Sequence, residues 1–151
     1  MKNTMTIEFV GLLQNVSVVR TAVACFASSL EPTLEEIADI RTAVSEAVTN
    51  AIVHGYRGAE GIVTAECRID GSELTVEVSD AGCGIEDVEL AMQPFYTSGP
   101  EEERTGIGFA VMDAFMDSLE VVSKPGRGTK VTMTKRILSN KTADQERRQN
   151  E

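Results

Sequence analysis

The chain has 151 residues, of which 42% are hydrophobic and 25% are charged, a composition that indicates one globular domain and excludes disorder over most of the length. Its formal net charge of −10 excludes a broad surface for nucleic acid or for an anionic membrane. No apolar run approaches the ~18 residues of a membrane helix, so we expect a cytoplasmic protein. Three cysteines without a CxxC pair and one histidine argue against a disulfide framework or a zinc site.

The first part of the chain predicts one strand and two helices. Apolar and polar residues alternate over residues 5–9, which is typical of a strand with one buried face. Apolar spacings of three and four over residues 16–30 predict a helix capped by Asn15 or Ser17. Thr33 and Glu36 have capping-box spacing and start a second helix that Gly55 would end. The apolar stripe of that helix comprises Leu34, Ile37, Ile40, Val44, Val48, Ala51 and Ile52.

The second part predicts four strands, a long loop and a third helix. Residues 62–69 and 73–79 alternate around Asp70-Gly71, which predicts an antiparallel hairpin. Residues 80–108 are expected to be mostly loop, with a helical turn near 87–91, and a helix is expected to begin near Gly108. Strands at 119–122 and 129–135 follow. This order predicts an α+β, two-layer sandwich over residues 1–138, with a mostly antiparallel sheet covered on one face by helices, and a polar tail at 139–151.

The first group of candidate functional residues lies on the second helix. Glu46, Asn50 and His54 are spaced four apart and so form one row. Such a row is typical of the solvated side of a surface helix. An asparagine amide oxygen is also a good ligand for Mg²⁺, and a carboxylate one turn away could take a proton from a hydroxyl group. Both interpretations are open at this point.

The second group follows the strand at 73–79. Asp80, Gly82 and Gly84 form a DxGxG pattern, and its glycines are compatible with an ordinary loop that needs positive φ angles. Alternatively, the carboxylate accepts a hydrogen bond from an exocyclic amino group such as that of adenine, while the glycines let the backbone approach the ring. Cys83 is interpreted as a small packing residue rather than a reactive thiol.

The third group leads into the third helix. Gly106 and Gly108 flank Ile107, and backbone amides at a glycine-rich helix N-terminus bind phosphate. The pattern is not a P-loop, because no GK[ST] follows. It could nevertheless hold an acidic ligand locally on a protein of negative net charge.

These three groups, in this order and followed by Gly126-Arg127-Gly128-Thr129, resemble the boxes of the ATPase and kinase family that includes gyrase, Hsp90, histidine kinases and MutL. Residues 44–56 are most similar to the small bacterial anti-sigma kinases, above all those of the sporulation sigma factor, sigma F. Those of the general-stress sigma factor are a weaker match. The resemblance extends over about residues 5–137 and implies the Bergerat ATP-binding fold.

The resemblance implies a role for each candidate residue. Asn50 matches the Mg²⁺ ligand, Glu46 matches the general base that prepares a protein serine for attack on ATP, and Asp80 matches the residue that binds the adenine amino group. The other residues implied to bind ATP are Gly82, Gly84, Arg104, Thr105, Gly106, Ile107, Gly108 and Thr129, with residues 94–105 as the ATP lid. Arg20 matches an arginine that meets both the sigma factor and its antagonist.

The implied function is that of a homodimeric, ATP-dependent protein serine kinase that inhibits a sigma factor, expected to be sigma F. Its substrate would be an anti-anti-sigma protein, which phosphorylation inactivates. Three alternatives remain open: a kinase acting in the general-stress pathway, a non-catalytic ATP-gated module that binds sigma, and a hydrolase of the gyrase or Hsp90 type. Glu46 argues against the passive module, and the polar tail leaves no room for the transducer domain of such hydrolases.

Overall fold

The computed structural model describes residues 1–93, 103–138 and 149–150, with the backbone alone for residues 103–107. Five strands form one sheet in the order β1-β2-β3-β5-β4, and every neighbouring pair is antiparallel. Their bounds are Lys2–Val10 for β1, Ile62–Asp70 for β2, Glu73–Asp80 for β3, Ser118–Lys124 for β4 and Gly128–Arg136 for β5. The predicted strands, the hairpin at Asp70-Gly71 and the antiparallel sheet are confirmed.

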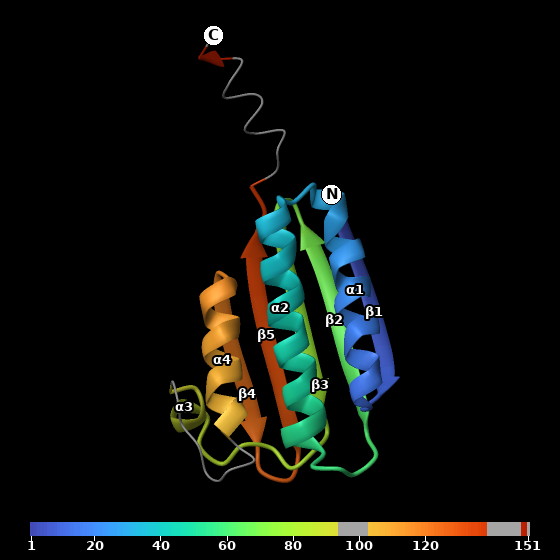
Figure 1. The fold of residues 1–151 in the computed structure, drawn as a ribbon, viewed down its shortest axis with the longest axis vertical. Coiled ribbons are helices and arrows are strands. Elements are labelled where there is room, and N and C mark those ends of the chain that lie inside the picture. Colours follow the sequence, from blue (N-terminus) through green and yellow to red (C-terminus); the bar gives the residue numbers. More distant parts are fainter. Residues whose placement is uncertain (94–102, 139–148, 151) are drawn as a thin grey trace.

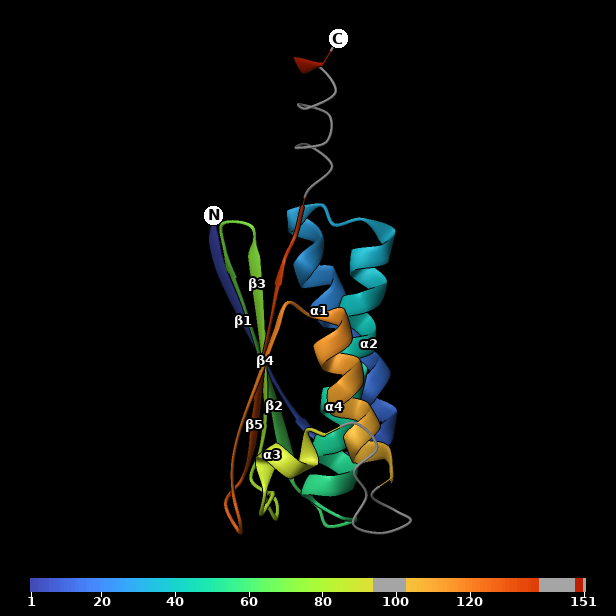
Figure 2. The same cartoon turned by 90° about the vertical axis from the view of Figure 1, so that its left-hand side faces the viewer.

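The helices form the second layer, on one face of the sheet (Figures 1 and 2). They are α1 (Val16–Ala27), α2 (Leu34–Asn50) and α4 (Glu103–Phe115), with a short α3 (Val88–Ala91) where a helical turn was expected. Single turns extend two of them: η2 (Ser28–Leu30) follows α1, and a π-helix, η3 (Ala51–Gly55), follows α2. The predicted α+β two-layer sandwich is therefore confirmed. No helix in the described part of the chain is long and apolar enough to cross a membrane.

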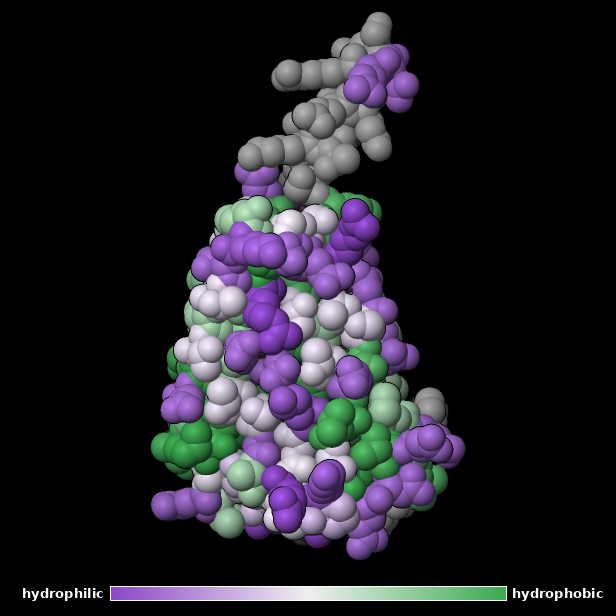
Figure 3. All heavy atoms as spheres, turned by 180° about the vertical axis from the view of Figure 1, so that it is seen from behind, coloured by the Kyte–Doolittle hydropathy of each residue, from purple (hydrophilic) through white to green (hydrophobic). Residues whose placement is uncertain are grey.

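The core lies between these layers because each strand alternates its side chains between two faces. From β2, Val63, Ala65 and Cys67 point to the helices and are fully buried. Burial raises the pKa of the Cys67 thiol to about 12, so this cysteine stays protonated and acts as a packing residue. The opposite face is mainly polar, with apolar patches toward one end (Figure 3). One register row across that face consists of Thr6, Glu66, Glu77, Thr132 and Glu120.

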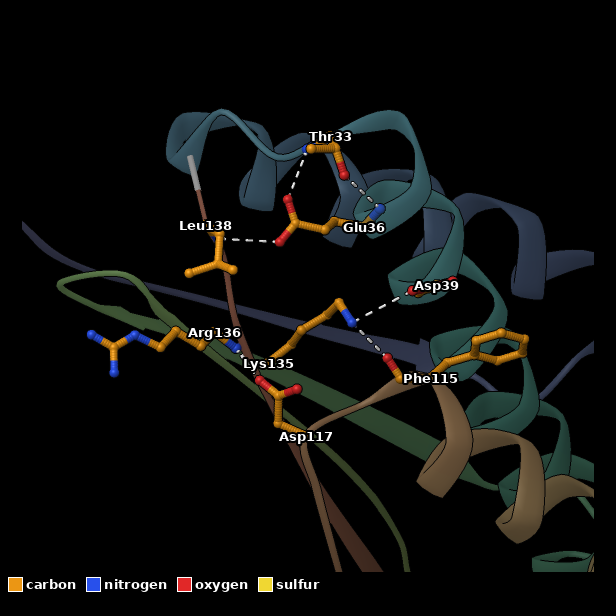
Figure 4. Close-up of polar contacts among 8 residues, drawn as sticks. All are labelled: Thr33, Glu36, Asp39, Phe115, Asp117, Lys135, Arg136 and Leu138. Carbon is orange, nitrogen blue, oxygen red and sulfur yellow. Dashed lines mark hydrogen bonds and ion pairs between the residues drawn. The ribbon is translucent and has the colours of Figure 1, made fainter. Parts of the chain in front are cut away.

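The N-terminus of α2 is fixed by its capping box (Figure 4). The Thr33 hydroxyl accepts from the Glu36 backbone N–H at 3.1 Å, and the Glu36 carboxylate accepts from the Thr33 backbone N–H at 2.9 Å. The second carboxylate oxygen of Glu36 accepts from the Leu138 N–H at 3.1 Å, which ties the end of the domain to α2. The predicted capping box is confirmed.

A buried lysine joins α2, α4 and β5 near the same end (Figure 4). The Lys135 ammonium lies 3.5 Å from the Asp39 carboxylate and donates to the Phe115 carbonyl oxygen at 2.7 Å. Phe115 ends α4, where unpaired carbonyls and the helix dipole favour a cation. The Asp117 carboxylate accepts from the Arg136 backbone N–H at 2.6 Å. These contacts hold α4 beside α2, and α4 in turn forms one wall of the site described below.

The third helix begins at Glu103 rather than near Gly108, so this prediction was wrong. A glycine costs a helix only ~1 kcal/mol relative to alanine, and burial of Phe109 and Met112 outweighs that cost. Gly106 and Gly108 therefore lie inside the first turns of α4, not at a bend between loop and helix. Within α4, only the amides of residues 103–105 lack an acceptor in the helix, and the Gly106 amide is the first to pair.

Two predictions about helix ends were also wrong. Leu34 is 90% exposed, because side chains lean toward the helix N-terminus and that of the first residue points beyond the end of the helix. Asn15 makes no capping hydrogen bond, because its backbone is already helical, whereas a capping residue needs an extended one. Its side-chain amide donates instead to the Val10 carbonyl oxygen at 2.8 Å. Residues 94–102 of the expected lid and 139–148 and 151 of the tail lie outside the described residues.

Candidate functional site

A cavity of about 470 Å³ opens where β3 ends, β5 begins and α2 passes into η3. This volume is within the range of sites for small molecules and cofactors. Four of the predicted site residues line it: Asn50, Asp80, Gly84 and Thr129. Phe109 of α4 and Ala91 of α3 contribute to its apolar wall. The cavity thus brings together residues from the first two sequence groups and from the strand near the C-terminal end.

Asp80 is the last residue of β3 and pairs directly with Thr129 of β5. Its carboxylate accepts from the Gly82 N–H at 2.9 Å and from the backbone N–H of Thr129. Burial raises the pKa of the Asp80 carboxyl, and these two hydrogen bonds oppose that rise only in part. The side chain is therefore a fixed, partly desolvated hydrogen-bond acceptor.

The glycines around Asp80 allow backbone segments to touch. A Cβ on Gly82 would lie 2.1 Å from the Gly55 carbonyl oxygen, and one on Gly55 would lie 2.7 Å from the Asp80 carboxylate. The same Gly55 oxygen accepts from the Cys83 N–H at 2.8 Å. Gly84 has a φ of +73°. The loop therefore packs on the end of η3, and this close packing explains the glycine at position 82.

Glu46, Asn50 and Gly108 converge beside the cavity. Asn50 is only 9% exposed, and its side-chain nitrogen Nδ2 has no hydrogen-bond partner among the described residues. A Cβ on Gly108 would lie 2.9 Å from Asn50 Nδ2 and 3.2 Å from both Asn50 Oδ1 and Glu46 Oε2. The interpretation of this row as a solvated helix side is wrong for Asn50. An unpaired buried amide nitrogen is rare in proteins, and this one is a free donor for a ligand or a water molecule.

Two comparisons with known proteins bear on this site. The histidine kinase-like ATPase domain family matches residues 9–135, which contain every cavity residue named above. The anti-sigma F factor of Thermoanaerobacter sp. (strain X514) is 58% identical over 139 residues, which cover 92% of this chain and 97% of that protein. That of Clostridium kluyveri (strain ATCC 8527) is 56% identical over 133 residues, covering 88% and 94%. The chain belongs to the anti-sigma F factor family.

This membership confirms the resemblance predicted from the sequence. The matching family model is that of a kinase-like ATPase domain, so the domain binds ATP. Among solved structures, the blue-light activated histidine kinase of Erythrobacter litoralis EL346 matches with a TM-score of 0.56 and 22% identity. The match covers 84% of this chain but only 43% of that kinase, so it shows the fold alone.

The remaining predicted residues of this family member lie in two other places. Arg20 is on α1, partly buried and outside the cavity lining, and its Nε has no hydrogen-bond partner in the part of the chain that the structure describes. The stretch Arg104, Thr105, Gly106 and Ile107 forms the first turns of α4, and its side chains lie outside the described part.

Sequence reasoning missed two residues that build the site. The Ser123 hydroxyl accepts from the Ile85 N–H at 2.8 Å, donates to the Gly128 carbonyl oxygen at 2.9 Å and contacts the Thr129 hydroxyl at 2.8 Å. Its signal was a polar residue at an inward-facing position of β4, after Leu119 and Val121. The other is Tyr56, whose hydroxyl contacts the Asp80 loop.

Cys83 is exposed, so the prediction that it packs was wrong, and its thiol donates to the His54 carbonyl oxygen at 3.2 Å.

Proposed function

We propose that the protein is an ATP-dependent protein serine kinase that binds sigma F, holds it inactive, and phosphorylates a serine of an anti-anti-sigma protein. The observation that carries the proposal is the convergence of Glu46, the unpaired Asn50 amide and Gly108 beside the cavity that contains Asp80. Relatives that match over nine-tenths of the chain are named anti-sigma F factor, and this name supports a sigma factor as the partner.

ATP would lie with its base at Asp80 and its phosphates toward α4. The Asp80 carboxylate would accept from the adenine amino group, beside Gly84 and Thr129. The unpaired amides at the start of α4, residues 103–105, would bind phosphate oxygens with the positive end of the helix dipole. Arg104 and Thr105 would contact the phosphates at this helix start, whereas the amides of Gly106 and Ile107 pair within α4 and would not bind phosphate.

Asn50 fits the proposed magnesium ion because its side-chain amide lines the cavity and glycine at 108 leaves room beside it. The unpaired Nδ2 is a hydrogen-bond donor, so it would donate to a phosphate or water oxygen while Oδ1 faces the ion. No group of three or more His, Cys, Asp or Glu side chains among the described residues could hold a metal. Mg²⁺ in nucleotide sites is commonly held by one or two protein oxygens together with phosphates and water. The Asn50 oxygen would supply the protein ligand, and the bound ion would neutralise phosphate charge.

Glu46 would act as the general base. The serine hydroxyl oxygen of the partner forms a bond to the γ-phosphorus, the bond between that phosphorus and the β,γ-bridging oxygen breaks, ADP leaves, and the serine proton passes to the Glu46 carboxylate. Arg20 would contact the protein partners from α1. The exposed edge of β1 would pair with a second copy in a homodimer.

The proposal is tested by incubating the purified protein with γ-labelled Mg-ATP, sigma F and the candidate antagonist. We expect calorimetry to detect Mg-ATP binding, sigma F to co-elute with the protein, and label to appear on one serine of the antagonist. Absence of Mg-ATP binding contradicts the proposal. Steady release of phosphate with no labelled protein would indicate a hydrolase instead.

Replacing Asp80 with asparagine should weaken ATP binding and stabilise the protein without nucleotide. Loss of a hydrogen bond to a charged acceptor predicts a roughly 10- to 100-fold lower ATP affinity. Burial raises the pKa of Asp80 in the folded state, so between the unfolded and the folded pKa the folded state binds more protons and loses stability as the pH rises. The ionised carboxylate therefore lowers stability at neutral pH, and D80N removes this effect.

Thermal unfolding of D80N and of the parent at pH 7 and near pH 3, together with calorimetry, checks both expectations. The stabilisation should be present at pH 7 and absent near pH 3, below the unfolded pKa, where the parent carboxyl is also neutral. D70N is the matched control, since Asp70 is 75% exposed at the other end of the sheet. A less stable D80N with unchanged ATP affinity would contradict this account.

A further inference from the structure

Tyr56 is held rigidly where the chain returns from η3 to the sheet. A Cβ on Gly61 would lie 2.1 Å from the ring carbon Cε1 of Tyr56, so the ring fills the space beside that glycine. On the other edge, the Cβ position of Gly11 is 3.5 Å from the ring. The Gly11 N–H donates to the Gly61 carbonyl oxygen at 2.8 Å, which keeps the two glycines together. The position of the Tyr56 hydroxyl is therefore determined by packing.

That hydroxyl occupies the next hydrogen-bonding position of the sheet. Val63 of β2 pairs with Asp80 of β3, so Ile62 and Ala81 are next in register. The Tyr56 hydroxyl accepts from the Ala81 N–H at 2.9 Å and donates to the Ile62 carbonyl oxygen at 2.5 Å. One oxygen atom thus stands between a donor and an acceptor that would otherwise face each other across the ladder.

We propose that Tyr56 is a positioning residue that sets selectivity for adenine by holding Ala81, and with it the Asp80 carboxylate, away from β2. This inference rests on the proposed function of Asp80. In the described part of the chain Tyr56 is not among the residues that line the cavity, so it acts through the backbone of residues 80–82. Without the hydroxyl, the Ala81 N–H and the Ile62 oxygen can pair directly. That pairing draws the end of β3 toward β2 and moves the acceptor for the adenine amino group.

The test compares binding of Mg-ATP and Mg-ITP to the parent and to Y56F by calorimetry. ITP has a carbonyl oxygen where ATP has the amino group. It therefore lacks the amino group from which Asp80 would accept a hydrogen bond. We expect the parent to prefer ATP and Y56F to lose about tenfold in ATP affinity, with ITP affinity unchanged, as for one lost hydrogen bond. S118A is the matched control, because it removes a hydroxyl contact with Thr134 on the opposite face of the sheet.

A second variant, G61A, displaces the ring without removing the hydroxyl and should give the same loss of selectivity. Equal preference of the parent for ATP and ITP refutes the role of Asp80, and the inference falls with it. A parent that prefers ATP, together with Y56F and G61A variants that keep this preference, refutes the inference about Tyr56 alone. A loss of affinity for both nucleotides in equal measure indicates a merely structural role and also overturns it.

Discussion

Replacing Glu46 with glutamine is expected to slow phosphoryl transfer about 10²- to 10⁴-fold, the range that a general base contributes. ATP affinity should change by less than about threefold, because the adenine ring is proposed to contact Asp80 and the phosphates are proposed to contact α4. Glutamine keeps the size and shape of the side chain beside Gly108 but cannot accept a proton from serine. The expected signature is therefore normal nucleotide binding with very little product.

Single-turnover transfer of label from γ-labelled ATP to the antagonist measures the rate, and calorimetry measures nucleotide binding. E35Q is the matched control, because Glu35 is an exposed glutamate in the first turn of the same helix. E35Q should transfer label at the parental rate. If E46Q did so as well, Glu46 would not be the base, and the proposed chemistry would have to rely on positioning and charge neutralisation alone.

The features that depend on local pattern could be predicted from the sequence. Alternation located the strands, and the capping box at Thr33 and Glu36 located the start of α2, because both signals act within a few residues. The position of Asp80 at a strand end followed from the same reasoning. These local elements were sufficient to derive the two-layer sandwich.

The features that depend on distant segments could not be predicted. The Tyr56 hydroxyl acts on Ala81, 25 positions away, and this contact is visible only once the register of β2 and β3 is known. The desolvation of Asn50 likewise depends on Gly108 of α4, which is distant in sequence but packs against Asn50 in the fold. Helical spacing alone did not distinguish Asn50 from a solvated polar side chain, and only the family resemblance gave it a role. Nothing in the sequence gave Tyr56 a role.

Gly128 lies against the backbone of residues 80 and 81 so closely that a side chain has no room. Replacing it with alanine is therefore expected to have the largest effect on stability. Its φ is +103°, and a Cβ there would lie 2.0 Å from the Asp80 carbonyl oxygen and 2.8 Å from the Ala81 Cα. Backbone atoms paired in a sheet cannot rotate away as a flexible side chain could. We expect a loss of ~4 kcal/mol or more in the free energy of unfolding, together with weaker ATP binding because Asp80 is displaced.

Gly126 in the same turn provides a control that separates the steric contact from backbone strain. Its φ is +76°, yet nothing lies within 4 Å of its Cβ position. G126A should therefore cost only the ~1–2 kcal/mol of a left-handed residue and leave ATP affinity unchanged. Urea unfolding and calorimetry of both variants make the comparison. Similar losses of stability in G126A and G128A would mean that β5 can shift away from Asp80, and the rigid strand end on which the adenine contact depends would then be absent.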